Sequence, residues 1–217
     1  IKDYSGTYAI ASKGDQASNR GWVLRSAAGT LVFIFSQNGS SGIAASASVS
    51  LTTAGYTADT SYFFKVTRVS SSGLVQFYGS SDGTTYTQIG ANVTAITGAM
   101  FNSTGQVCVG TWNSDSNDFL GGIGGVTIAN SIGGTPVVDF NPASYNAATS
   151  QTSWVSATSE TWTINTGTDT TGYKGVLVDR TIMQGDGVDD KLNSGALTSV
   201  STFTRYIAAN PLQRTGF

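Results

Sequence analysis

Short runs of apolar and β-branched residues, separated by turn-forming residues, fill most of the chain. The run 21–35 (GWVLRSAAGTLVFIF) reads as two strands joined by a turn at Ala27–Thr30. Thr, Val, Ile, Tyr and Phe dominate such runs, Gly, Asn, Asp and Ser interrupt them, and helical periodicity is nearly absent. The pattern therefore predicts an all-β protein.

The run 62–69 (YFFKVTRV) shows the alternation most clearly. It places Phe64 and Arg68 on one face of a strand, and Lys65 and Thr67 on the other. A strand with this pattern has one face toward a core and the other toward solvent.

Further strands follow at short spacing. The segment Leu74–Gly90 contains two strands that flank Ser81–Gly83, a hairpin signal, and the runs Gln106–Trp112 and Ile123–Ala129 read as later strands. Strands joined by polar turns indicate an antiparallel β-sandwich or barrel rather than βαβ units. We expect the following residues to be buried: Phe33, Phe64, Val66, Val75, Phe77, Val107, Val109 and Ile128.

Composition removes several classes of function. The 217 residues include no histidine and one cysteine, which excludes Ser-His-Asp and Cys-His nucleophiles, histidine metal sites and an intrachain disulfide. With 11 basic and 13 acidic residues scattered along the chain, nucleic acid and anionic membranes are not expected as partners. Ser, Thr and Gly fill 85 positions, yet aromatic residues recur throughout, so we expect an ordered protein.

Three segments in this order resemble the concanavalin A-like, laminin G-like jelly roll. They are YFFKVTRVSSSGLVQFYGSSDGTTYTQIG at 62–90, QVCVGTW at 106–112 and FLGGIGGVTIAN at 119–130. In that family, a strand with an aromatic residue and an Arg precedes V-x-F-Y-x-S-x-D-G, and a closing strand follows F-x-G-x-I-x-x-V-x-I. The resemblance covers about Gly21–Asn130 and implies an antiparallel β-sandwich. The same fold hosts lectins, glycosidases, adhesion modules and phage structural modules, so it does not choose among functions.

The sequence divides into three parts. Residues 1–130 form the jelly-roll module, which lacks the family's opening strand at its N-terminus. Residues 131–182 form a Ser/Thr/Asn-rich trailing segment, expected to pack through Trp154 and Trp162, and similar to segments that follow such modules in tailed-phage virion proteins. Residues 183–217 resemble opening strands, which either begin a next module or complete the first.

Three explanations for this arrangement remain open: a piece of a tandem array, a circular permutation, or exchange of strands between copies. A sheet without its opening strand would leave N–H and C=O groups unpaired along its neighbour. We therefore expect Gly187–Leu192 and Phe203–Ala208 to pair beside the strands near Ala9–Ile10 or Val126–Ile128.

The sequence contains little that would support catalysis. The glucanases of the resembling family carry a Glu-x-Asp-x-x-Glu arrangement, whereas the only glutamate here is Glu160, with no acidic residue after it until Asp169. We assign no catalytic residue and expect a protein that is not an enzyme. Calcium is the one cofactor that we consider, because Asp115 and Asp118 lie in a loop where related modules hold this ion. The alternative is that these residues only form a turn.

The same loop carries the candidate glycan-binding residues. A sugar site combines an aromatic ring with amide and carboxylate groups, and the residues of this kind are Trp112, Asn113, Asp115, Asn117 and Asp118. The alternative for Trp112 is packing in the core, which we also expect for Trp22. Tyr78 is a further aromatic residue that could contribute to such a site if it lies on the same sheet as Trp22, which the sequence alone does not decide.

These observations favour a non-enzymatic structural and adhesive protein of a tailed phage, located on the virion surface as part of a tail fibre or a capsid decoration. Its expected partners are other virion proteins or copies of itself, forming a homo-oligomer, together with a cell-surface glycan. The alternative is an extracellular carbohydrate-binding module of a bacterial adhesin or enzyme. A glycoside hydrolase is the third reading.

Overall fold

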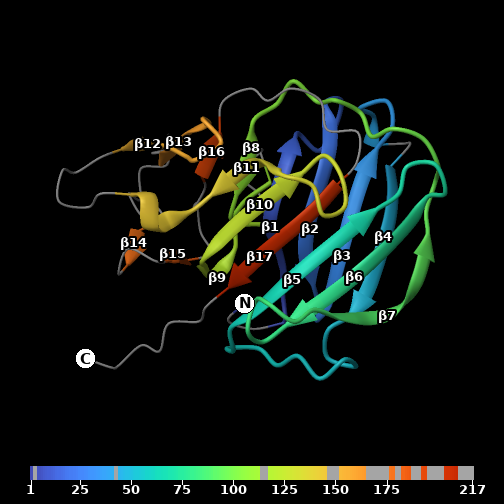
Figure 1. The fold of residues 1–217 in the computed structure, drawn as a ribbon, viewed down its shortest axis with the longest axis horizontal. Coiled ribbons are helices and arrows are strands. Elements are labelled where there is room, and N and C mark those ends of the chain that lie inside the picture. The colour runs from blue at the N-terminus through green and yellow to red at the C-terminus, as the bar shows by residue number, and fades with distance from the viewer. Residues whose placement is uncertain are drawn as a thin grey trace.

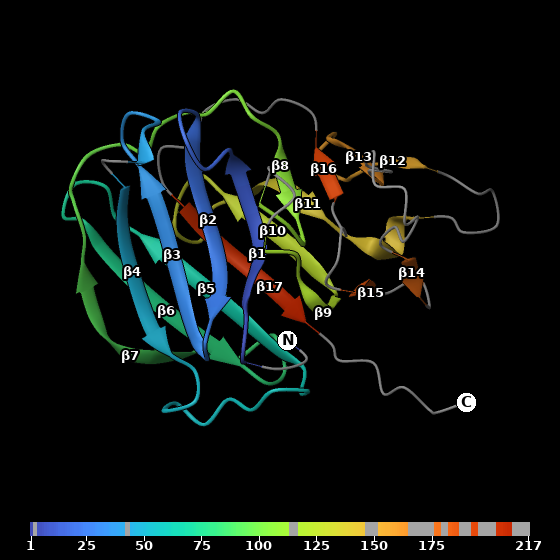
Figure 2. The ribbon, with the colours of Figure 1, turned by 180° about the vertical axis from the view of Figure 1, so that it is seen from behind.

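Two antiparallel sheets packed face to face form the body of the molecule in the computed structural model (Figures 1 and 2). The expected fold class, an all-β antiparallel sandwich, is confirmed. The structure describes the following residues, the last four ranges as backbone only: 1, 4–41, 44–112, 117–145, 152–164, 176–178, 182–186, 192–194 and 203–209. Within these residues there is no α-helix, and so none with the length and apolar character needed to cross a membrane.

The first sheet has eight strands, each antiparallel to its neighbours. In spatial order they are β12 (Ser153–Val155), β13 (Thr161–Ile164), β16 (Leu192–Ser194), β8 (Val107–Val109), β1 (Thr7–Gly14), β2 (Arg20–Ala27), β3 (Thr30–Ser36) and β4 (Ala44–Ser50). The turn expected at Ala27–Thr30 joins β2 to β3, as the sequence predicted.

The second sheet has six strands and lies in front of the first in Figure 1. In spatial order they are β11 (Pro136–Phe140), β10 (Gly125–Ala129), β17 (Phe203–Ala209), β5 (Tyr62–Arg68), β6 (Leu74–Ser80) and β7 (Thr87–Thr94). A smaller sheet consists of β14 (Val176–Val178), β15 (Ile182–Asp186) and β9 (Leu120–Ile123). A short 3-10 turn, η2 (Pro142–Ser144), follows β11.

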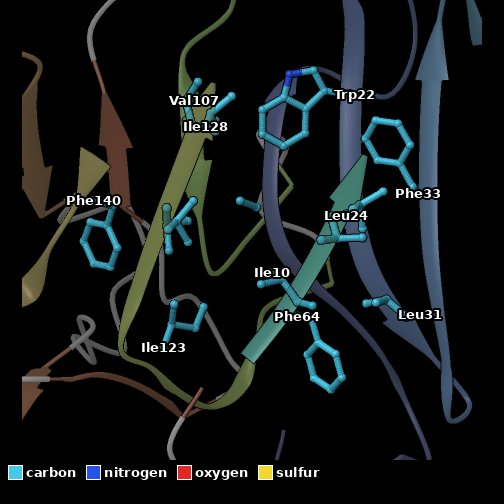
Figure 3. Packing of buried hydrophobic residues seen from close by; sticks show 14 of the residues in the cluster. Ile10, Trp22, Leu24, Leu31, Phe33, Phe64, Val107, Ile123, Ile128 and Phe140 are labelled. Carbon is cyan, nitrogen blue, oxygen red and sulfur yellow. The ribbon is translucent and has the colours of Figure 1, made fainter. Parts of the chain in front are cut away.

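The core lies between the two large sheets. Figure 3 shows Trp22, Leu24, Leu31 and Phe33 of the first sheet pointing into the space where Phe64 of the second sheet also lies. All eight residues that the alternation placed in the core are at most 3% exposed. The core position expected for Trp22 is confirmed as well, with 2% exposure.

The hairpin between β6 and β7 forms around the predicted turn residues. The Asp82 carboxylate accepts hydrogen bonds from the backbone N–H groups of Thr84 and Thr85, both at 2.8 Å, and from the Ser80 hydroxyl at 2.8 Å. Gly83 has a φ of +74°, and a Cβ on it would lie 2.9 Å from the Phe63 ring. The turn therefore needs an aspartate and a glycine at adjacent positions.

Strand β17 lies in the middle of the second sheet, between β10 and β5 (Figures 1 and 2). Its register pairs Ile207 with Val126 on one side and with Phe64 on the other. The expectation that Phe203–Ala208 pairs beside Val126–Ile128 is therefore confirmed, with both segments in one chain.

The other predicted segment, Gly187–Leu192, joins the eight-stranded sheet through Leu192. Leu192 pairs with Val109 of β8, and β8 pairs in turn with β1, so Leu192 lies one strand away from Ala9–Ile10. β8 already occupies the edge of β1, which leaves only the far side of β8 for another strand. The rest of the predicted segment, 187–191, lies outside the described residues.

The trailing segment packs through its aromatic residues. Trp154 and Trp162 pair across β12 and β13, and their exposed fractions are 6% and 0%. Both rings contact Phe140, with centroids 6.0 and 5.1 Å away, and Tyr145 contacts Trp154 at 5.6 Å. The two tryptophans thus extend the core beyond β11.

Candidate functional site

The loop between β8 and β9, which carries the glycan-binding candidates, folds back onto the edge of β1. The Ala9 N–H donates to the Asn117 carbonyl at 2.6 Å, and the Phe119 N–H donates to the Gly110 carbonyl at 2.7 Å. Asn113 and Asp115 lie outside the described residues. The structure therefore places three of the five candidates, one at the start of the loop and two at its end.

Trp112 lies against the outer face of the eight-stranded sheet. Its indole packs with Ala9, Val23 and Ile34, and the residue is 3% exposed. A ring buried in this way offers almost no face on which a sugar could stack. Of the two interpretations of Trp112, the described contacts fit core packing.

The other two described candidates differ in exposure. Asp118 is 8% exposed, and Asn117 is half-buried with a φ of +60°. Among the residues that the structure describes, no three His, Cys, Asp or Glu side chains lie close enough together to hold a metal ion. The calcium pair Asp115 and Asp118 stays a prediction, because Asp115 is outside the described residues.

A different group of side chains has the composition of a sugar site. It lies on the outer face of the six-stranded sheet, opposite the face that carries Phe64, Val66 and Phe77. The Lys65 ammonium nitrogen lies 4.6 Å from the ring centroid of Tyr78 and 4.7 Å from that of Tyr86. These cation–π contacts hold two partly exposed tyrosine rings beside one another.

Three amide side chains continue the group along β6 and β7. The Gln76 amide nitrogen donates to the Gln88 oxygen at 3.2 Å and to the Asn92 oxygen at 3.0 Å, and the Gln88 nitrogen donates to Asn92 at 2.9 Å. Tyr78 pairs directly with Gln88 across the two strands. We call Lys65, Gln76, Tyr78, Tyr86, Gln88 and Asn92 the tyrosine–amide face.

The sheet's alternation explains why these side chains meet. Phe64 and Phe77 bury one face of β5 and β6, so Lys65 and Tyr78, which are paired across the strands, must share the other. Burial lowers the pKa of the Lys65 ammonium from its ordinary value. Sequence reasoning identified the face of Lys65 but not its neighbours, since register between strands decides them.

Tyr78 and Trp22, which could have shared a sheet, do not. Trp22 belongs to β2 of the eight-stranded sheet and points into the core, whereas Tyr78 belongs to β6 of the other sheet and points outward. The two rings therefore cannot form one binding surface.

The single glutamate of the chain, Glu160, is buried and hydrogen-bonded to neighbouring hydroxyl groups. The Glu160 carboxylate accepts hydrogen bonds from the Ser156 and Thr158 hydroxyls, both at 2.5 Å, and the residue is 7% exposed. Burial raises the pKa of the Asp139 carboxyl, and the nearby charge of Glu160 raises it further. The sequence could not place this pair of carboxylates together, because only the fold brings Asp139 of β11 close to Glu160, which precedes β13.

No protein-family model matches the chain, and no curated protein matches it either.

Proposed function

We propose that the protein is a non-enzymatic adhesive module of a tailed-phage virion, and that its tyrosine–amide face binds a neutral glycan. The observation that carries the proposal is the pair of tyrosine rings held by Lys65 beside the amides of Gln76, Gln88 and Asn92. A sugar ring has an apolar C–H face and a rim of hydroxyls, so it needs an aromatic surface with donors and acceptors beside it.

The amides suit hydroxyl recognition because each offers both a donor and an acceptor. Gln88 and Asn92 are exposed, and their mutual hydrogen bonds hold them in place before a ligand arrives. A ligand that meets side chains already in position loses less conformational entropy on binding. This arrangement favours a repeating polysaccharide lying along the sheet face over a small molecule in a deep pocket.

Three features support the virion assignment. The segment 62–90, which resembles concanavalin A-like modules, builds most of this face as β5, β6 and β7. The aromatic packing of Trp154 and Trp162 suits the trailing segment that such phage modules carry. The low charge and Ser/Thr/Gly-rich composition suit a particle surface that must stay soluble while it touches glycans. The second candidate function is a carbohydrate-binding module of an extracellular bacterial adhesin or enzyme.

Binding is tested by affinity electrophoresis in gels that contain neutral bacterial polysaccharides. We expect retardation of the wild-type protein, and its loss in Tyr78→Ala and in Gln88→Ala. Val155→Ala is the matched control, because Val155 is a 63% exposed apolar residue on β12. Equal migration of all four proteins in every gel would overturn the glycan assignment.

Location is tested separately, in a culture of the strain that encodes the chain. Mass spectrometry of particles purified after phage induction should detect the protein in the virion fraction. Detection only in the supernatant of uninduced cells would favour the extracellular adhesin. Light scattering of the purified chain tests the expected homo-oligomer.

A further inference from the structure

Two arginines lie beside the same indole on the outer face of the other, eight-stranded sheet. The guanidinium carbon of Arg20 is 4.9 Å from the ring centroid of Trp112, and that of Arg25 is 5.9 Å away. Trp112 is itself held against Val23, which lies between the two arginines on β2. The buried indole therefore fixes the positions of two positive charges.

The hydrogen-bonding capacity of these guanidinium groups is largely unused. Arg20 donates from one terminal nitrogen to the Gln16 carbonyl at 2.5 Å. In the part of the chain that the structure describes, Arg25 makes no hydrogen bond, and the Nε atoms of both arginines are buried without a partner. The Arg25 side chain is partly exposed.

Among the residues that the structure describes, Asp15 is the carboxylate that acts on this pair, and it acts on Arg20 alone. The Oδ1 of Asp15 also accepts the backbone N–H groups of Ala17, Ser18 and Asn19 at 2.8, 2.9 and 3.0 Å, and one carboxylate beside two guanidinium groups leaves the pair with a net positive charge. Burial, and then the charge of Arg25, lowers the pKa of Arg20. An arrangement of this kind is stabilised by any anion that neutralises it.

We propose that Arg20 and Arg25 bind the oxyanion groups of an acidic polysaccharide, either carboxylate or sulfate, on the outer face of the eight-stranded sheet. The planar guanidinium fork matches the geometry of both groups, and hydrogen bonds between ionised partners are about twice as strong as neutral ones. The Trp112 indole forms the apolar floor that keeps the guanidinium groups from rotating away. This site lies on the opposite sheet from the tyrosine–amide face and does not depend on it.

The test measures binding of dextran sulfate, polygalacturonate and unsubstituted dextran by isothermal titration calorimetry. We expect wild-type protein to bind at least one of the two anionic polymers more tightly than dextran, and the preferred polymer distinguishes sulfate from carboxylate. Arg25→Gln should weaken that binding at least about tenfold, whereas Arg25→Lys should retain part of it. Arg20→Gln should act like Arg25→Gln, and it provides the same test if Arg25→Gln does not fold.

The control is Ser71→Asp, which changes the net charge by the same amount in the exposed turn between β5 and β6. We expect it to bind the anionic polymers as wild type does. The proposal is wrong if neither anionic polymer binds more tightly than dextran, if the arginine variants bind as wild type does, or if Ser71→Asp weakens binding as much as they do.

Discussion

The guanidinium carbon of Arg68 lies 4.3 Å from the ring centroid of Phe35, so a charged side chain of β5 stacks on an aromatic ring of β3 between the two sheets. Arg68 is fully buried, and its terminal Nη2 donates to the carbonyls of Ile96 and Gly98 at 3.0 and 2.6 Å. These carbonyls belong to the loop that leads from one sheet to the other. One side chain therefore connects both sheets and the segment that crosses between them.

Replacing Arg68 should destabilise the fold. Arg68→Ala leaves a cavity and removes the donor to two carbonyls, so we expect a loss of about 2–5 kcal/mol in the free energy of unfolding. Arg68→Met keeps most of the volume and should lose less, about 1–2 kcal/mol. Urea denaturation followed by tryptophan fluorescence measures both. An Arg68→Ala midpoint equal to that of wild type would show that the guanidinium does not hold the loop.

The hairpin turn should be sensitive to acid. Hydrogen bonds, the strongest of them from the backbone N–H groups of Thr85 and Thr84, hold the pKa of the Asp82 carboxyl well below its usual range. A depressed pKa in the folded state stabilises the protein above the unfolded value, about 3.9, and this contribution is lost as the pH falls below it. Asp82→Ala should therefore melt at a lower temperature than wild type at pH 7, and the difference should shrink below about pH 4. A difference that stays constant down to pH 2 would contradict this account.

Asp139 should show the opposite pH dependence. Burial and the charge of Glu160 raise the pKa of its carboxyl, so its favourable contribution is complete below about pH 3.9 and is lost as the pH rises through the folded value. Asp139→Asn should therefore be more stable than wild type at pH 7 and equal to it near pH 3. The substitution leaves the hydrogen bond from Trp162 intact, because that bond goes to the Asp139 carbonyl. Thermal melts across this range measure the difference, and an Asn variant that is less stable at pH 7 would refute the prediction.

The same carboxylate pair should not catalyse glycoside hydrolysis. A glycosidase needs both carboxylates to reach the sugar, whereas Glu160 is 7% exposed and its carboxylate is engaged by Ser156 and Thr158. We expect no release of reducing sugar from β-glucans by the wild-type protein. Release that disappears in Asp139→Asn or Glu160→Gln would overturn this expectation.

Because β17 lies in the centre of the second sheet, changes to it should destabilise the fold. Ile207→Pro removes one backbone N–H from a strand that is paired on both sides, so the folded protein should be strongly destabilised. A chain that ends after Arg180 should likewise lose stability and expose the edges of β5 and β10. Thermal denaturation and size-exclusion chromatography with light scattering test both variants. Unchanged stability and assembly state would mean that these residues do not complete the sheet.

Local pattern was enough for much of this fold. The alternation in 62–69 placed Arg68 on the face of Phe64, and this face is the core. The turn signal at Ser81–Gly83 located a hairpin because its Asp and Gly satisfy the turn's own geometry. Resemblance to the opening strands of a jelly roll gave two expected neighbours for Phe203–Ala208, and the segment pairs with one of them, Val126–Ile128.

The surfaces could not be predicted in the same way. Nothing near Trp112 in the sequence indicates that Arg20 and Arg25 lie beside its ring, because they belong to another strand. The tyrosine–amide face likewise depends on the register of β5, β6 and β7, which sets Lys65 opposite Tyr78 and Tyr78 opposite Gln88. A single sequence shows which face a residue takes, but cross-strand neighbours follow from pairing between distant segments.

The insertion of β17 between β5 and β10 has a consequence for the order of events during synthesis. The hairpins built from β5, β6 and β7 need only neighbouring residues and can form as soon as they leave the ribosome. The contacts of Phe203 with Arg68 and of Ala209 with Tyr62 close loops that span most of the chain, and such contacts form slowly. Until β17 has been made, β5 and β10 present open edges, and the nascent chain is exposed to aggregation during that interval.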